Sequence, residues 1–205
     1  ADPVAVDTAL ARDPVLAPLV AARPGLRIPG SPDGWEAAAR AVVGQGVSVR
    51  AARTILGRMS AALGGRVDDP GDTAVRIAFP TPDTVAGAPD DALPMPAVRR
   101  RALRAVAAAV ASGELPLEPG DDPADVRTGL VRLPGIGPWT AECVALRMRA
   151  DPDAFPATDL AARRAAARLG LPDDPVRLTA RAEAWRPWRG YALLHLWTTT
   201  MEADR

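Results

Sequence analysis

The chain has 205 residues and carries 25 basic and 25 acidic side chains, so its formal net charge is zero. This balance argues against a nonspecific nucleic-acid binding protein, and the single Cys143 excludes an intrachain disulfide, a cysteine-only zinc site and a four-cysteine iron–sulfur cluster. No apolar run approaches the roughly 20 residues that span a bilayer, and Ala1-Asp2-Pro3 lacks a signal-peptide pattern, so we expect a soluble, intracellular protein.

Helical periodicity extends over most of the chain and is interrupted by turns rich in Pro, Gly and Asp. Residues 64–78 are ambiguous, and residues 112–123 are expected to form an extended connector. No convincing set of strands emerges, which predicts an all-α fold. Helices are expected at residues 7–21, 33–43, 47–63, 97–111, 123–130, 138–149, 158–169, 175–184 and 187–200.

Residues 133–141 form the most informative motif, Leu-Pro-Gly-Ile-Gly-Pro-Trp-Thr-Ala. Gly135 and Gly137 permit positive φ and close approach of a ligand, and Pro138 suits the first position of a helix. Leu133 and Ile136 are expected to anchor the loop by packing inward. Backbone N–H groups at the positive end of a helix dipole favour an anion, most simply a nucleic-acid phosphate. An ordinary connection between two helices is the alternative.

The hairpin, with Asp159 downstream, resembles the helix-hairpin-helix (HhH-GPD) DNA glycosylase superfamily. Further blocks in the family's order resemble its alkylation-repair branch, 3-methyladenine DNA glycosylase II, at residues 22–30, 41–49, 79–82 and 185–197. The likeness covers almost the whole chain. The small N-terminal α/β domain of the bacterial two-domain enzymes is expected to be missing, which leaves a short form or part of a longer protein.

The resemblance implies two helical lobes with an active-site cleft between them. One lobe is expected to contain residues 31–150 and to end with the hairpin, and the other to contain residues 1–30 and 151–205, with the catalytic Asp at the junction. The hairpin residues expected to contact DNA are Leu133, Gly135, Ile136, Gly137 and Thr140.

The implied activity is that of a monofunctional glycosylase of base excision repair. It would flip alkylated purines out of the duplex and hydrolyse their N-glycosidic bonds. Asp159 matches the family's catalytic Asp, which stabilises positive charge on the sugar and orients water. Thr158 or Asp159 could instead simply cap the following helix, and the two roles are compatible.

The same resemblance implies a base pocket. Trp139 and Trp197 are expected to stack against a cationic base, while Cys143 stands where relatives often present an aromatic side chain. His195 is more typical of a structural hydrogen bond than of acid–base chemistry. Core packing is the favoured interpretation of three further aromatic residues, Trp185, Trp188 and Tyr191.

Besides Cys143 and the missing N-terminal domain, one further feature departs from what the family shows. A bulky residue that fills the gap left by the flipped base commonly follows the Gln at the position of Gln45, but this chain has Gly46 there. Either Gln45 or a neighbour contacts the duplex gap, or flipping is weaker, or the preferred lesions already disrupt stacking. The chain also contains no Lys, and Trp139 occupies the position of the Schiff-base Lys of lyase relatives, which excludes lyase chemistry by that route.

No cofactor is expected to be required, although the resemblance suggests that the carbonyls of Val131, Leu133 and Ile136 hold a sodium or potassium ion when DNA is bound. Some of the Arg clusters, at residues 99–101, 163–164 and 186/189, are expected to contact phosphates. We expect a monomer whose partner is double-stranded DNA with damaged bases. Association with a membrane is not expected. The protein is expected in the bacterial cytoplasm, where it would associate with the nucleoid through DNA.

Two other functions stay open. A glycosylase-like fold could bind damaged DNA without removing a base, which Gly46 and the neutral charge favour. The enzyme could also excise a different base, such as uracil, hypoxanthine or a bulky adduct.

Overall fold

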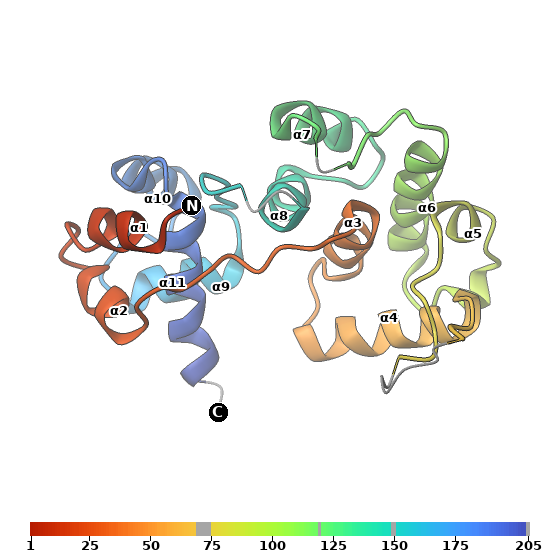
Figure 1. Ribbon diagram of the computed structural model, residues 1–205, viewed down its shortest axis with the longest axis horizontal. Coiled ribbons are helices and arrows are strands. Elements are labelled where there is room, and N and C mark those ends of the chain that lie inside the picture. The colour runs from red at the N-terminus through yellow and green to blue at the C-terminus, as the bar shows by residue number, and fades with distance from the viewer. Residues whose placement is uncertain (69–74, 119, 149–150, 204–205) are drawn as a thin grey trace. The chain divides into compact units, whose positions relative to one another are not determined.

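The chain folds mainly into helices (Figure 1). The computed structural model describes residues 1–68, 75–118, 120–148 and 151–203. Within these ranges the only extended pairing is an isolated antiparallel bridge between Arg66 and Ile77, so the predicted all-α fold class is confirmed. The elements are α1 (Pro3–Leu10), α2 (Ala17–Ala22), α3 (Gly34–Val43), α4 (Val49–Leu63), α5 (Pro82–Ala86), η1 (Asp90–Ala92), α6 (Ala97–Ala111), α7 (Pro123–Val131), α8 (Pro138–Met148), α9 (Leu160–Arg168), α10 (Pro175–Ala182), η2 (Glu183–Trp185) and α11 (Arg189–Ala203).

The first predicted helix, over residues 7–21, is wrong as a single element. Helix α1 begins earlier because the carboxylate of Asp2 accepts a hydrogen bond from the Val4 N–H and caps it. The break between α1 and α2 lies at Asp13, whose side chain accepts a bond from the Val15 N–H. Pro14 disfavours helical geometry at the residue before it, which helps to end the helix there. The apolar periodicity nevertheless continues across this turn, and it therefore predicted one helix.

The structure also contains elements that the periodicity did not reveal. Helix α5 spans only Pro82–Ala86 and is capped by the Thr81 hydroxyl, which accepts a bond from the Thr84 N–H. The ambiguous stretch over residues 64–78 contains the Arg66–Ile77 bridge, and residues 69–74 lie outside the described ranges. Among residues 112–118 and 120–122, which the structure describes, the predicted connector contains no helix or strand, and it buries Leu115 and Leu117.

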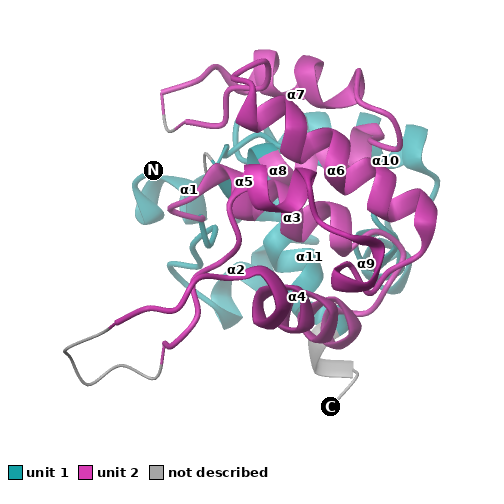
Figure 2. Cartoon of the chain, turned by 90° about the vertical axis from the view of Figure 1, so that its right-hand side faces the viewer, with its two compact units in different colours: residues 1–30, 145–205 teal, residues 31–144 magenta. Residues whose placement is uncertain are grey.

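The chain divides into two compact units (Figure 2). Unit 1 comprises residues 1–30 and 145–205, and unit 2 comprises residues 31–144. The second boundary therefore precedes the one predicted after residue 150. Ala145 and Leu146, at the end of α8, are fully buried in the core of unit 1, which explains its position. Residues 149–150 lie outside the described ranges.

Unit 2 is organised around α6, which packs against both α3 and α5. The buried face of α3 includes Trp35, whose indole N–H donates to the carbonyl of Pro80 at 2.8 Å and so ties α3 to the start of α5. The buried Leu103 and Val106 of α6 complete this core. The hairpin between α7 and α8 belongs to the same unit.

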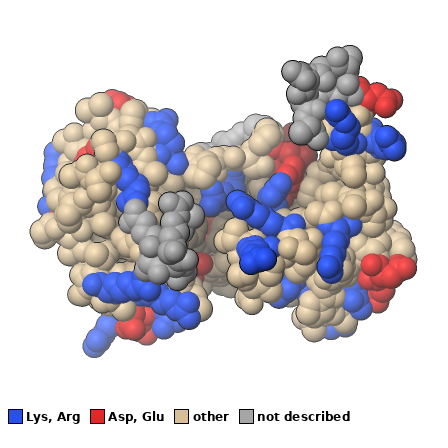
Figure 3. Space-filling view, turned by 90° about the horizontal axis from the view of Figure 1, so that it is seen from below, with Lys and Arg blue, Asp and Glu red and all other residues tan. Residues whose placement is uncertain are grey.

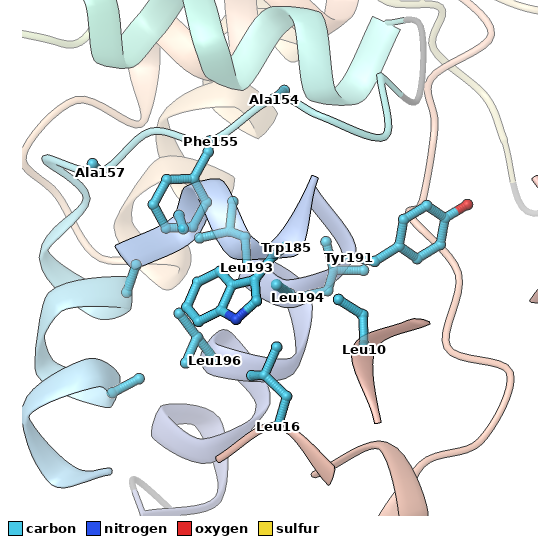
Figure 4. Close-up of a cluster of buried hydrophobic side chains, with 14 of the residues drawn as sticks. Leu10, Leu16, Ala154, Phe155, Ala157, Trp185, Tyr191, Leu193, Leu194 and Leu196 are labelled. Carbon is cyan, nitrogen blue, oxygen red and sulfur yellow. The ribbon is translucent and has the colours of Figure 1, made fainter. Parts of the chain in front are cut away.

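Unit 1 is organised around α11, whose residues 191–196 are all buried, and Figure 4 shows Tyr191, Leu193, Leu194 and Leu196 in this core. Trp185 and Tyr191 are 2% and 4% exposed, and the Trp185 ring meets Phe155 edge to face. Trp188 packs against the same core in a partly buried position. These aromatic side chains therefore contribute to packing, as predicted for all three residues.

A charged group anchors the turn between α1 and α2 to this core. The Asp13 carboxylate accepts a hydrogen bond from the Trp185 indole N–H at 2.6 Å and forms an ion pair with Arg181. The Arg181 guanidinium also lies 5.1 Å from the centre of the Trp185 ring. Burial raises the pKa of Asp13, but the hydrogen bonds from Trp185 and Arg181 oppose it, and the net effect is a pKa below 3.8. The carboxylate is therefore ionised at neutral pH.

Candidate functional site

The hairpin between α7 and α8 is a tight turn that depends on Gly135. This residue has φ of +80°, a conformation that L side chains rarely adopt, and a Cβ here would lie 2.8 Å from the Cβ of Ala102 on α6. Gly137 is not among the residues with positive φ. The Ile136 side chain is buried and Leu133 is partly buried, in agreement with an inward-facing anchor.

The hairpin leaves backbone donors exposed at the start of α8. The carbonyl of Gly137 accepts bonds from the N–H groups of Thr140 and Ala141, and Pro138 is the first helical residue. Within the described part of the chain, the N–H groups of Gly135 and Gly137 donate no hydrogen bond, and both residues are exposed. Two donors beside a helix N-terminus suit an anionic oxygen.

Gln45 contacts the hairpin directly. Its Nε2 donates to the Thr140 hydroxyl at 2.8 Å and to the Gly135 carbonyl at 3.2 Å. Arg99, one of the clustered arginines, donates from its guanidinium to the backbone carbonyl of Gln45. The loop that follows α3 is thus connected to both the hairpin and α6, which the sequence did not predict.

Gly46 occupies the exposed tip of the loop after α3. Its φ is +63°, and a Cβ built on it would meet nothing within 4 Å. The positive φ therefore favours glycine at this position. The space around it would admit a larger side chain. The expected contact of Gln45 and Gly46 with a duplex gap stays a prediction.

The carbonyls expected to hold a cation lie at the end of α7 and in the hairpin. The Leu133 carbonyl accepts a hydrogen bond from the Ile136 N–H at 3.2 Å, and a carbonyl oxygen has a second lone pair for another partner. Among the residues that the structure describes, no group of three or more His, Cys, Asp or Glu side chains could hold a metal ion. The cation site formed by backbone carbonyls stays a prediction.

Asp159 is the N-cap of α9. Its Oδ1 accepts hydrogen bonds from the Ala162 N–H at 2.8 Å and from the Trp197 indole N–H at 2.9 Å. Both interpretations of Asp159 from the sequence are thus compatible with its geometry, because the cap leaves the side chain partly exposed. Trp197, predicted as a base-stacking residue, here also fixes the carboxylate.

Trp139 and Cys143 lie one turn apart on α8, and both are partly exposed. Arg147 lies one turn further along the same face. Its guanidinium lies 5.6 Å from the centre of the Trp197 ring, and its Nη1 donates to the carbonyl of Pro29 at 3.1 Å. Arg147 was not predicted as a site residue, although its helical spacing from Trp139 and Cys143 was a usable signal.

Many of the clustered arginines have partners within the protein. Arg186 and Arg189 form ion pairs with Asp153 and Glu183, and the Arg163 guanidinium donates to the carbonyl of Asp173. In the face shown in Figure 3, basic side chains are more prominent than acidic ones. No helix in the described ranges is long and apolar enough to cross a membrane.

Comparison with known proteins links this arrangement to DNA repair proteins. The family model of the AlkA N-terminal domain matches residues 1–33, so part of the domain expected to be missing has a counterpart here. The chain is 46% identical over 199 residues to a protein of Mycobacterium tuberculosis, a probable bifunctional transcriptional activator/DNA repair enzyme AlkA, with 97% of this chain and 40% of the relative covered. It is 40% identical to DNA-3-methyladenine glycosylase 2 of Escherichia coli, with 88% and 63% covered.

A solved structure shows a matching fold over nearly the full length of the chain. The 3-methyladenine DNA glycosylase of Schizosaccharomyces pombe in complex with abasic DNA superposes with a TM-score of 0.79 at 25% identity, with 98% of each chain covered. The chain spans less than two thirds of the length of the two bacterial relatives, at 40% and 63%.

Proposed function

The chain belongs to the AlkA-like 3-methyladenine DNA glycosylase family, and we propose that it is a DNA glycosylase that excises alkylated purines from damaged double-stranded DNA. The observation that carries this proposal is the geometry of Asp159. Two N–H donors, one from α9 and one from Trp197, fix its carboxylate at the helix N-terminus, where negative charge is favourable.

The proposed reaction needs little acid catalysis. A purine alkylated at N3 or N7 is positively charged, so it leaves as a neutral base when its bond to the sugar C1′ breaks and the bonding electrons go with the base. Positive charge develops on the sugar, and the Asp159 carboxylate stabilises it. The oxygen of a water molecule then bonds to C1′ and the water releases one proton.

The hairpin is proposed to hold the DNA backbone while the base is extruded. The exposed N–H groups of Gly135 and Gly137 supply donors for a phosphate oxygen. A sodium or potassium ion held by the carbonyls of Val131, Leu133 and Ile136 would bridge to a phosphate, although the proposed chemistry itself needs no metal. Binding of this kind reads the backbone rather than the sequence.

The enzyme is proposed to be monofunctional and to act as a monomer. The chain contains no Lys, and Trp139 stands at the hairpin position of the Schiff-base residue in lyase relatives. Water is then the nucleophile, so the product is an intact strand that carries an abasic site.

The test compares release of 3-methyladenine and 7-methylguanine from methylated duplex DNA by the unmodified chain and by Asp159→Asn. Asn is as good an N-cap as Asp, so the variant keeps its fold while losing the negative charge. We expect release to fall at least about a hundredfold. Asp174→Asn is the matched control, because Asp174 caps α10 in the same unit through the N–H groups of Val176 and Arg177.

Binding to the same DNA is measured in parallel. Release by the unmodified chain and by Asp174→Asn, but not by Asp159→Asn, supports the proposal. Binding without release by the unmodified chain overturns it, and indicates either a noncatalytic damaged-DNA binding module or a glycosylase for uracil, hypoxanthine or a bulky adduct. Defined duplexes with these lesions distinguish the two.

A further inference from the structure

Arg147 connects several segments of unit 1. Its side chain is partly buried, and its Nη1 donates to the Pro29 carbonyl at 3.1 Å while the guanidinium lies 5.6 Å from the centre of the Trp197 ring. Pro29 and Arg147 lie just beside the two points where the chain passes from one unit to the other, after residues 30 and 144. One side chain thus holds both of these segments against α11.

The contact with Trp197 matters because the same ring also forms a hydrogen bond with Asp159. The indole N–H of Trp197 donates to Oδ1 of Asp159 at 2.9 Å. A ring that is held by a cation over one face and by a hydrogen bond at its edge is restricted both in tilt and in rotation. Because the indole donor and the Ala162 N–H share the same carboxylate oxygen, the ring orientation helps to set the direction of the carboxylate.

The same contact limits how Trp197 can meet a base. The guanidinium of Arg147 lies over one face of the ring, so a base that stacks on that face must displace it. A cationic alkylated base would also meet like charge there. The geometry therefore favours an orienting role for Trp197 on that side.

We propose that Arg147 is a positioning residue, which acts through Trp197 to orient the Asp159 carboxylate. This inference rests on the proposed glycosylase function. It assigns to Arg147 an effect on the chemical step and little effect on DNA binding. Arg147 is not itself assigned a contact with the reacting atoms.

The experiment uses Arg147→Met, which keeps an apolar side chain but removes the charge, and Arg147→Lys, which restores a cation. With methylated duplex DNA, we expect kcat to fall about tenfold in Arg147→Met with KM within twofold, and to recover largely in Arg147→Lys, since a cation–π contact has an effect of this size. In a Trp197→Phe background, Arg147→Met should cause no further loss. Arg168→Met is the control, because Arg168 also donates to a carbonyl of α11, that of Thr199.

A second readout does not depend on activity. The Trp197 indole N–H resonance, assigned by its loss in Trp197→Phe, should shift in Arg147→Met and stay in place in Arg168→Met. An unshifted resonance with unchanged kcat overturns the proposal, as does an equal loss of kcat in the Trp197→Phe background. If the unmodified chain releases no alkylated base, the proposed function fails, and the resonance still tests whether Arg147 orients Trp197.

Discussion

His195, the single histidine of the chain, is more deeply buried than any charged residue in the described ranges, with 1% of its surface exposed. Its Nδ1 has no hydrogen-bond partner among the described residues. Burial lowers the pKa of His195 below 6.5, the nearby Asp7 carboxylate raises it, and the Arg23 guanidinium lowers it. A role in packing agrees with this burial, because a neutral imidazole is the form that the core tolerates, but the predicted structural hydrogen bond is not formed at Nδ1.

The free energy of unfolding is therefore predicted to decrease as the pH falls below 6.5. In that range the unfolded chain binds a proton that the folded chain resists, until the pH reaches the lowered pKa of the folded state. One such group changes stability by at most about 1.4 kcal/mol per pH unit. Urea unfolding between pH 7 and pH 5 measures this slope.

His195→Gln serves as the comparison for that measurement. The variant should show a flatter pH dependence over the same range, whatever its absolute stability. The pKa of Asp13, which lies below 3.8, contributes stability that is present above 3.8 and is lost only as the pH falls through the lowered pKa. Equal slopes in both chains would show that other groups cause the dependence.

At the scale of the elements, the Gln45 contacts join the loop after α3 to the hairpin. Gln45→Ala removes the bonds to Thr140 and Gly135, and we expect the affinity for undamaged duplex to fall about fivefold, as the loss of about 1 kcal/mol implies. The reason is that the hairpin loses a support for its turn. Fluorescence anisotropy with undamaged and abasic duplexes measures the change.

Two variants sharpen this prediction. Gln45→Glu keeps the shape but cannot donate to the Gly135 carbonyl, so it should resemble Gln45→Ala. Thr140→Val removes one partner and retains the other, so its effect should be smaller. If Gln45 instead fills the gap left by an extruded base, the loss would appear with abasic duplex alone.

Apolar periodicity predicted both ends of α6, which has no side-chain cap, and periodicity together with a capping residue predicted the start of α3. Helix α6 spans Ala97–Ala111 as predicted, and α3 begins directly after Asp33, whose carboxylate accepts a bond from the Glu36 N–H. The region around Asp13 failed because periodicity continued through a turn, and α5 was missed because five residues give too little periodicity to detect. Local signals therefore predicted elements better than they predicted breaks.

At the scale of the whole molecule, the contacts between distant segments were the part that the sequence could not reveal. The hairpin and Asp159 were found from local patterns and family resemblance. The bonds from Trp197 to Asp159 and from Gln45 to Thr140 join residues far apart in the chain. Only the packing of the elements brings such pairs together, because neither partner carries a local signal for the other.

The neutral charge of the chain predicts a weak salt dependence of DNA binding. Each phosphate that an Arg neutralises contributes about −0.9 to the slope of log K against log salt. Some of the 25 basic residues already form ion pairs within the protein, so we do not count them as phosphate contacts. Binding to undamaged duplex, measured from 50 to 200 mM salt, should give a slope no steeper than about −4. The arginines that form ion pairs within the protein are Arg40, Arg100, Arg104, Arg127, Arg181, Arg186 and Arg189.

Two neighbouring arginines on α6 test the reason for this prediction. The Arg101 side chain is exposed and forms no hydrogen bond or ion pair within the described ranges, whereas the Arg100 side chain is paired with Asp90. If unpaired arginines supply the phosphate contacts, Arg101→Gln should make the slope shallower by about 0.9, and Arg100→Gln should leave it unchanged. A slope of −6 or steeper, or an equal change in both variants, would mean that DNA competes successfully for the paired arginines, and net charge would then understate the binding surface.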